Sequence, residues 1–161
     1  MSIGLETATP LSPAERQAAQ SVLGESALRW DDVRVVTGGI WAPLWAINHR
    51  RAVTTFHTIN IPGAEREACI DVMVHELTHV MQFEKVGAIY IPEALHAQAT
   101  DGYGYGSLDD ARAAGKPFSQ FNREQQAQLA QDYYNAAVGN NTRHAVGYYQ
   151  SYIDQLRAGE L

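Results

Sequence analysis

The chain of 161 residues lacks several features, and each absence excludes a class of protein. It has one cysteine, Cys69, so no intrachain disulfide can form. Acidic residues outnumber basic ones, and the net charge of −6 provides no electrostatic footprint for nucleic acid or an anionic membrane. No apolar run approaches the roughly 20 residues of a membrane span. We therefore expect neither nucleic-acid nor membrane partners.

We also expect no secretory signal peptide, because residues 1–10 have neither a basic start nor an apolar stretch. We expect this segment to be flexible, and the protein to be cytoplasmic or exported by a system that needs no signal peptide. Hydrophobic residues make up 45% of the chain and charged residues 19%, the balance of a soluble globular protein. At this length we expect one domain, residues 1–161.

The pattern of elements predicts one helix at the start of the chain, then two strands, and helices after them. Val33, Val35 and Val36 indicate a first strand, and residues 52–61, rich in β-branched side chains, indicate a second. A strand at this place could offer its edge to an extended peptide. His57 lies on it, where a single histidine usually makes structural hydrogen bonds. Helices are expected over 12–23, 64–85, 92–100, 108–114, 122–138 and 142–156, the last burying Tyr148, Tyr149, Tyr152, Ile153 and Leu156.

The most informative stretch is His75-Glu76-Leu77-Thr78-His79. It lies in the helix predicted over 64–85, whose apolar residues step by four, three and four. Residues four apart stack on one side of a helix, so His75 and His79 can present two imidazoles to one metal ion. Zinc accepts imidazole nitrogen readily and leaves a position for water at catalytic sites, and Glu76 would lie beside that water as a general base.

Two histidines need a third ligand, and the downstream candidates are Glu93, His96 and Glu124. The length of the chain does not decide between these candidates, since residues 88–92 in an extended conformation could bring Glu93 back to the metal. Both glutamates also lie in the first turn of a predicted helix, where the dipole favours a negative charge. The neighbourhood favours Glu124, because the small side chain of Ala127 lets its helix approach the histidine helix closely.

Tyr103 and Tyr105 lie in a glycine-tyrosine loop that lacks the lysine and hydroxyl residue of a P-loop. Their hydroxyls could hydrogen-bond a developing oxyanion, which makes both tyrosines candidate catalytic residues. The alternative is aromatic packing with the hydroxyls at the surface. Both interpretations stay open at this point.

Several pieces of the sequence resemble a small family of bacterial H-E-x-x-H proteins, often labelled vgr-related, found beside type VI secretion and Rhs-type toxin genes. The similar pieces are Leu11-Ser12-Pro13-Ala14-Glu15, Ser21-Val22-Leu23-Gly24, Asp31-Asp32-Val33-Arg34-Val35, His75-Glu76-Leu77-Thr78-His79-Val80-Met81-Gln82, Ala94-Leu95-His96-Ala97-Gln98 and Glu124-Gln125-Gln126-Ala127. They follow the family's order along nearly the whole chain.

The resemblance implies a zincin-like α+β fold, mainly helical, with a small mixed or antiparallel sheet before the histidine helix. It also implies a gluzincin-type zinc metallopeptidase in which Zn²⁺ is held by His75, His79 and Glu124 and Glu76 is the base. The substrate would be a peptide or protein, and the chain would be an effector or partner of a secretion system. The alternative is a non-catalytic, accessory or chaperone-like component of such a system.

Overall fold

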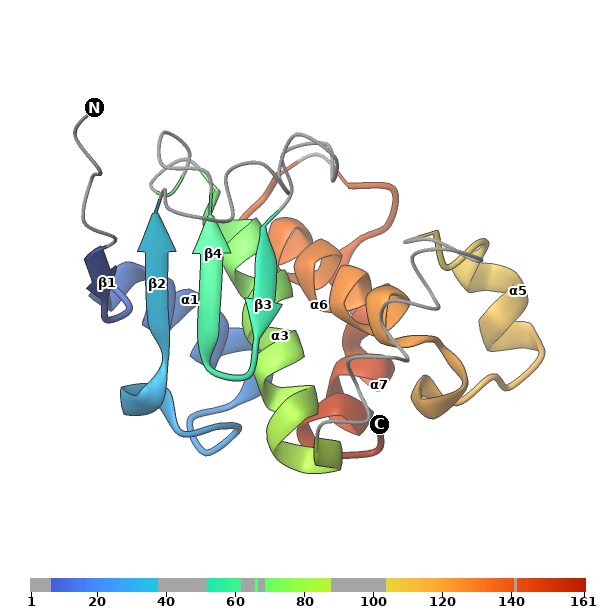
Figure 1. Ribbon diagram of the computed structural model, residues 1–161. Coiled ribbons are helices and arrows are strands. Elements are labelled where there is room, and N and C mark those ends of the chain that lie inside the picture. Colours follow the sequence, from blue (N-terminus) through green and yellow to red (C-terminus); the bar gives the residue numbers. More distant parts are fainter. Residues whose placement is uncertain (1–6, 38–51, 62–65, 67–68, 88–103, 141) are drawn as a thin grey trace.

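The computed structural model describes residues 7–37, 52–61, 66, 69–87, 104–140 and 142–161, which form an α+β arrangement (Figure 1). Its five α-helices in these ranges are α1 (Pro13–Leu23), α3 (Ile70–Val86), α5 (Leu108–Ala113), α6 (Arg123–Ala137) and α7 (Val146–Arg157). The strands are β1 (Thr7–Thr9), β2 (Arg34–Thr37), β3 (Val53–Thr55) and β4 (Thr58–Ile61), with short 3₁₀ turns η1 (Trp30–Asp32) and η3 (Phe118–Gln120). The helix predicted over 92–100 lies outside the described residues.

The described strands form one mixed sheet in the order β1-β2-β4-β3, and all of them precede α3 as predicted. β2 and β4 run parallel, whereas β1 pairs with β2 and β3 with β4 in antiparallel fashion. β3 therefore lies at one edge of the described sheet. The single strand predicted over 52–61 was wrong, because a tight turn at Phe56 and His57 divides it into a hairpin. Phe56 has a φ of 56°, a conformation that glycine or asparagine usually supplies, so the sequence carries no hairpin signal there.

Helix starts were predictable where a capping box was present. Ser12 accepts a hydrogen bond from the backbone N–H of Glu15, whose carboxylate accepts one from the backbone of Ser12. Asn122 and Gln125 make the same reciprocal pair at the start of α6. These bonds satisfy backbone donors that have no partner inside the helix, which fixes where each helix begins.

α3 is the central helix, because it packs against α1, α6 and β3 (Figure 1). The predicted apolar face is confirmed: Val74, Leu77 and Met81 are at most 1% exposed, and Ile70 packs against them at the edge of the core. The helix begins at Ile70 rather than at the predicted residue 64. Its long buried middle section carries the histidine motif between the sheet and α6.

α7 begins at Val146 rather than near residue 142, and four of its five predicted core residues are buried: Tyr149, Tyr152, Ile153 and Leu156. Tyr148 is 38% exposed, so its predicted burial was wrong. The four buried residues repeat at three and four positions, and Tyr148 lies about 100° round the helix from Tyr149. Its ring instead stacks on His144 and lies under the guanidinium of Arg112.

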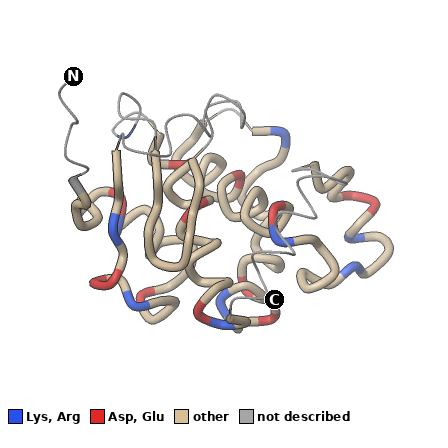
Figure 2. Tube along the Cα trace, in the orientation of Figure 1, with Lys and Arg blue, Asp and Glu red and all other residues tan. Residues whose placement is uncertain are grey.

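Charged residues of both signs are interspersed along the described trace (Figure 2). Ion pairs join the segment before β2 to the helices, with Arg16 contacting Asp31 and Arg29 contacting Glu84. No helix in the described ranges combines the length and the apolar character that crossing a membrane requires.

Candidate metal centre

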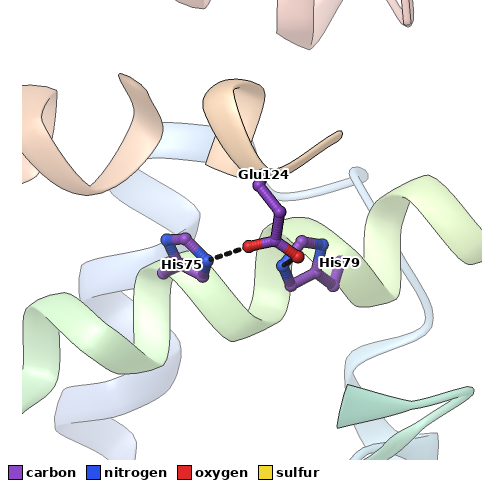
Figure 3. Close-up of side chains that lie close together, drawn as sticks. All are labelled: His75, His79 and Glu124. Atoms are coloured by element: carbon purple, nitrogen blue, oxygen red, sulfur yellow. Dashed lines mark ion pairs between the residues drawn. The ribbon is translucent and has the colours of Figure 1, made fainter. Parts of the chain in front are cut away.

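Two helices bring His75, His79 and Glu124 together (Figure 3). The two imidazoles project from successive turns of α3, with ring centroids 5.0 Å apart. Nε2 of His75 lies 3.4 Å from Oε2 of Glu124, and Nε2 of His79 lies 3.4 Å from Oε1 of the same carboxylate. One ligand atom from each residue falls within 4.8 Å of the others, so this cluster could hold a metal ion.

Glu124 reaches the histidines because the start of α6 is fixed beside α3. It lies in the first turn, directly before Gln125 of the capping box, so the helix dipole favours its negative charge. Ala127, one turn further on, is fully buried, and its small side chain permits the close approach of the two helices that the sequence predicted. The position of Glu124, its charge and the packing of its helix are all compatible with a shared metal ion.

Burial and charge shift the pKa values of His79 and Glu124 in opposite directions. The three residues of the cluster are between 1% and 6% exposed. Burial lowers the pKa of His79, but the hydrogen bond and charge of Glu124, together with the charge of Glu76, outweigh it and raise the pKa to about 9. Burial raises the pKa of Glu124, yet the bonds to both histidines hold that pKa well below its usual range. A carboxylate thus remains ionised in an almost completely buried place.

Glu76, the predicted general base, is 6% exposed and contacts the edge strand. The hydroxyl of Thr54 on β3 donates a hydrogen bond of 2.6 Å to Oε2 of Glu76. This bond fixes one carboxylate oxygen, and the orientation of the side chain with it. Thr54 was not predictable from the sequence, because only the hairpin shows which β3 residue lies opposite Glu76.

Tyr105 is placed beside α6, two helical turns along from Glu124. Its hydroxyl donates to Oδ2 of Asp132, whose other oxygen accepts a bond of 2.9 Å from Gln128. Burial, together with the bond to Asp132, raises the pKa of the phenol above its ordinary value. These residues and Arg143 line a hollow of their own. The role of Tyr105 as an oxyanion donor stays a prediction, and Tyr103, Glu93 and His96 lie outside the described residues.

His57 makes a structural hydrogen bond, as predicted for a single histidine. Its Nε2 lies 2.6 Å from Oε1 of Glu84, and its ring meets Phe83 edge to face. Both partners belong to the last turns of α3, so His57 joins the β3–β4 turn to that helix. Within the described ranges, the cluster of His75, His79 and Glu124 is the group of ligand side chains suited to a metal.

No family model, curated protein or solved structure matches this chain. Functional inference therefore rests on the chemistry of the site.

Proposed function

We propose that the protein is a zinc-dependent, metallopeptidase-like hydrolase with a zincin-like fold and a gluzincin-type ligand set. The observation that carries the proposal is the convergence of His75, His79 and Glu124 on one buried point, beside Glu76 of the same motif. Imidazole nitrogen and carboxylate oxygen are ligands that zinc accepts, and three of them are typical of a catalytic site.

The distances place both imidazoles around one carboxylate. Nε2 of His75 lies 3.4 Å from Oε2 of Glu124, and Nε2 of His79 lies 3.4 Å from Oε1. One ligand atom from each of the three residues lies within 4.8 Å of the others. His75 and His79 would hold the ion through Nε2, and Glu124 through a carboxylate oxygen.

The chemistry that zinc supplies when bound is acidification of the attacking water and polarisation of a carbonyl group. Glu76 accepts a proton from this water and returns it to the leaving amine, which completes hydrolysis of an amide bond. Thr54 holds one oxygen of Glu76, so that the carboxylate keeps its orientation during both transfers. β3, the outer strand of the described sheet, would bind an extended peptide through backbone hydrogen bonds. This arrangement supports a peptide or protein as the proposed substrate.

The resemblance to the vgr-related family extends the proposal to a bacterial secretion context. The chain would travel with, or act on, a type VI or Rhs-type system, and co-purification with secretion components tests this part. A non-catalytic, accessory role in the same system is the second candidate. It differs in one measurable respect, because the protein would bind zinc without hydrolysing any peptide.

The test is metal analysis combined with proteolysis of mixed peptides for the wild type and Glu76→Gln. We expect about one zinc per chain in both, and a loss of hydrolysis of about 10²–10⁴-fold in the variant, because an amide cannot accept the proton. Glu84→Gln is the control, since it removes a carboxylate of the same helix that contacts His57 instead. Full activity of Glu76→Gln contradicts the mechanism. Unchanged zinc content in both His75→Ala and His79→Ala contradicts the ligand assignment.

A further inference from the structure

Behind His79, on the side opposite Glu124, the ring meets a buried glutamine. Nδ1 of His79 lies 2.8 Å from Oε1 of Gln82, three residues further along α3. Gln82 is fully buried, so its amide must find all its hydrogen-bond partners inside the protein. Besides His79, its partners are Arg123 and Gln126 on α6.

The partners of Gln82 determine which way its amide points. Nε2 of Gln82 lies 3.0 Å from the carbonyl oxygen of Arg123, and a carbonyl can only accept. The same Nε2 lies 3.0 Å from Oε1 of Gln126, which also accepts a bond from the guanidinium of Arg123. Nε2 of Gln126 in turn donates to the carbonyl oxygens of Phe118 and Phe121, at 3.3 and 3.1 Å. Each amide is therefore oriented by groups that can only accept or only donate.

The orientation of the Gln82 amide determines the protonation of the His79 ring. Only the oxygen of Gln82 is left to face the ring, so Nδ1 of His79 must carry a hydrogen and donate it. A neutral imidazole has one N–H, and its lone pair is then on Nε2, the atom that lies 3.4 Å from Glu124. The opposite tautomer would place a lone pair against the oxygen of Gln82.

The same contacts also hold the two helices together at the site. Arg123 is adjacent to Glu124 in the first turn of α6, and Gln126 lies two residues beyond it. A bond from Gln82 to either residue therefore sets the distance between His79 and Glu124 as well as the orientation of the ring.

We propose that Gln82, anchored by Gln126, is a positioning residue that fixes His79 with Nε2 directed at the metal site. The effect of Gln82 on zinc binding rests on the proposed function. Groups that orient a metal-ligating histidine typically change metal affinity by 10–100-fold when they are removed, and a loss in this range is expected for Gln82→Met.

The matched control is Gln131→Met. Gln131 lies on α6 and, like Gln82, bridges α3 and α6, because its Nε2 donates a bond of 2.7 Å to Oδ2 of Asp71. This bridge does not contact His79. We expect both variants to lower the thermal midpoint, whereas only Gln82→Met weakens zinc binding measured by competition with a chromogenic chelator. Gln126→Met breaks the anchor one bond further away and should weaken zinc binding in the same direction, which keeps the test open if Gln82→Met fails to fold.

A second readout follows the ring itself. In protein labelled with ¹⁵N-histidine, the Nδ1–H of His79 should be protected from exchange with water in the wild type and in Gln131→Met, and unprotected in Gln82→Met. Equal zinc affinities for the two methionine variants, or an unchanged Nδ1–H signal in Gln82→Met, would overturn the proposal. If the wild type binds no zinc, the zinc proposal fails, while proton exchange in the metal-free protein still decides the role of Gln82.

Discussion

We expect the metal-free protein to lose stability as the pH rises above neutrality, because His79 then loses the proton that pairs it with Glu124. The folded protein raises the pKa of His79 to about 9, whereas the unfolded chain leaves it at the ordinary value of 6.5. Between these values the folded state binds the proton and the unfolded state does not. Stability from this pair is thus fully present below pH 6.5 and is lost as the pH rises through about 9.

The size of the effect follows from the same two values. One pKa unit corresponds to about 1.4 kcal/mol, so the difference between 6.5 and about 9 gives roughly 3 kcal/mol for this buried ring. Glu124 acts in the opposite direction at acid pH. Its folded pKa is depressed, so its contribution is present above its ordinary value of 4.5 and lost as the pH falls through the folded value. The pair therefore stabilises the metal-free fold most between about pH 5 and 6.5.

The assay is urea unfolding in the presence of a chelator, at about pH 6 and about pH 10, for the wild type and Glu124→Gln. The variant removes the partner of His79 and leaves the remaining titrating groups in place. We expect the free energy of unfolding of the wild type, relative to the variant, to fall by roughly 3 kcal/mol between the two conditions. An unchanged or rising difference would refute the argument.

Zinc affinity should rise with pH, whereas the stability of the metal-free protein falls. The reason is that zinc binds His79 only after its proton has left. In the window between pH 6.5 and about 9, zinc affinity should increase about tenfold per pH unit for the one proton released. Competition titrations with a chelator measure this directly. Affinity that weakens with rising pH over that range would show that His79 is not a ligand.

Three further predictions concern contacts that the structure places around the site. Thr54→Val should lower kcat by about tenfold with zinc content unchanged, whereas Thr54→Ser should keep the wild-type rate, because only the hydroxyl holds Glu76. Glu15→Gln should lower the free energy of unfolding by about 2–3 kcal/mol in urea, because it leaves the charge of Arg66 without its buried partner. Tyr105→Phe should cost about 1–2 kcal/mol of stability while zinc content stays the same, and a large loss of kcat in that variant would support the oxyanion role.

The parts of the fold that were predictable depend on local patterns. The four-three-four spacing of apolar residues identified the buried face of α3, and reciprocal side chains at Ser12 and Asn122 identified the starts of α1 and α6. The hairpin was not predictable, since Phe56 adopts a left-handed conformation that its residue type does not signal. Tyr148 was misplaced because a stripe of tyrosines does not show where its edge lies.

The site was predictable to the extent that its residues are neighbours along α3. His75, Glu76 and His79 share one short motif, whereas the groups that orient them are remote in sequence. Thr54 is separated from Glu76 by 22 positions, and Gln82 from Gln126 by 44. A polar residue next to a metal motif has many chemically equivalent partners in the sequence, and only the packing of α3 against β3 and α6 selects one.

Two buried glutamates show why residue type and position are not sufficient to assign a metal ligand. Glu15 and Glu124 are 2% and 1% exposed, and both lie in the first turn of a helix that begins with a capping box. Glu15 faces the guanidinium of Arg66, which is always protonated and has no lone pair to offer, so that contact remains a salt bridge. Glu124 faces two imidazoles, each of which can exchange a proton for a metal ion at Nε2. The difference between a structural ion pair and a metal centre is therefore set by the group opposite the carboxylate, and that group becomes known only when the helices are packed.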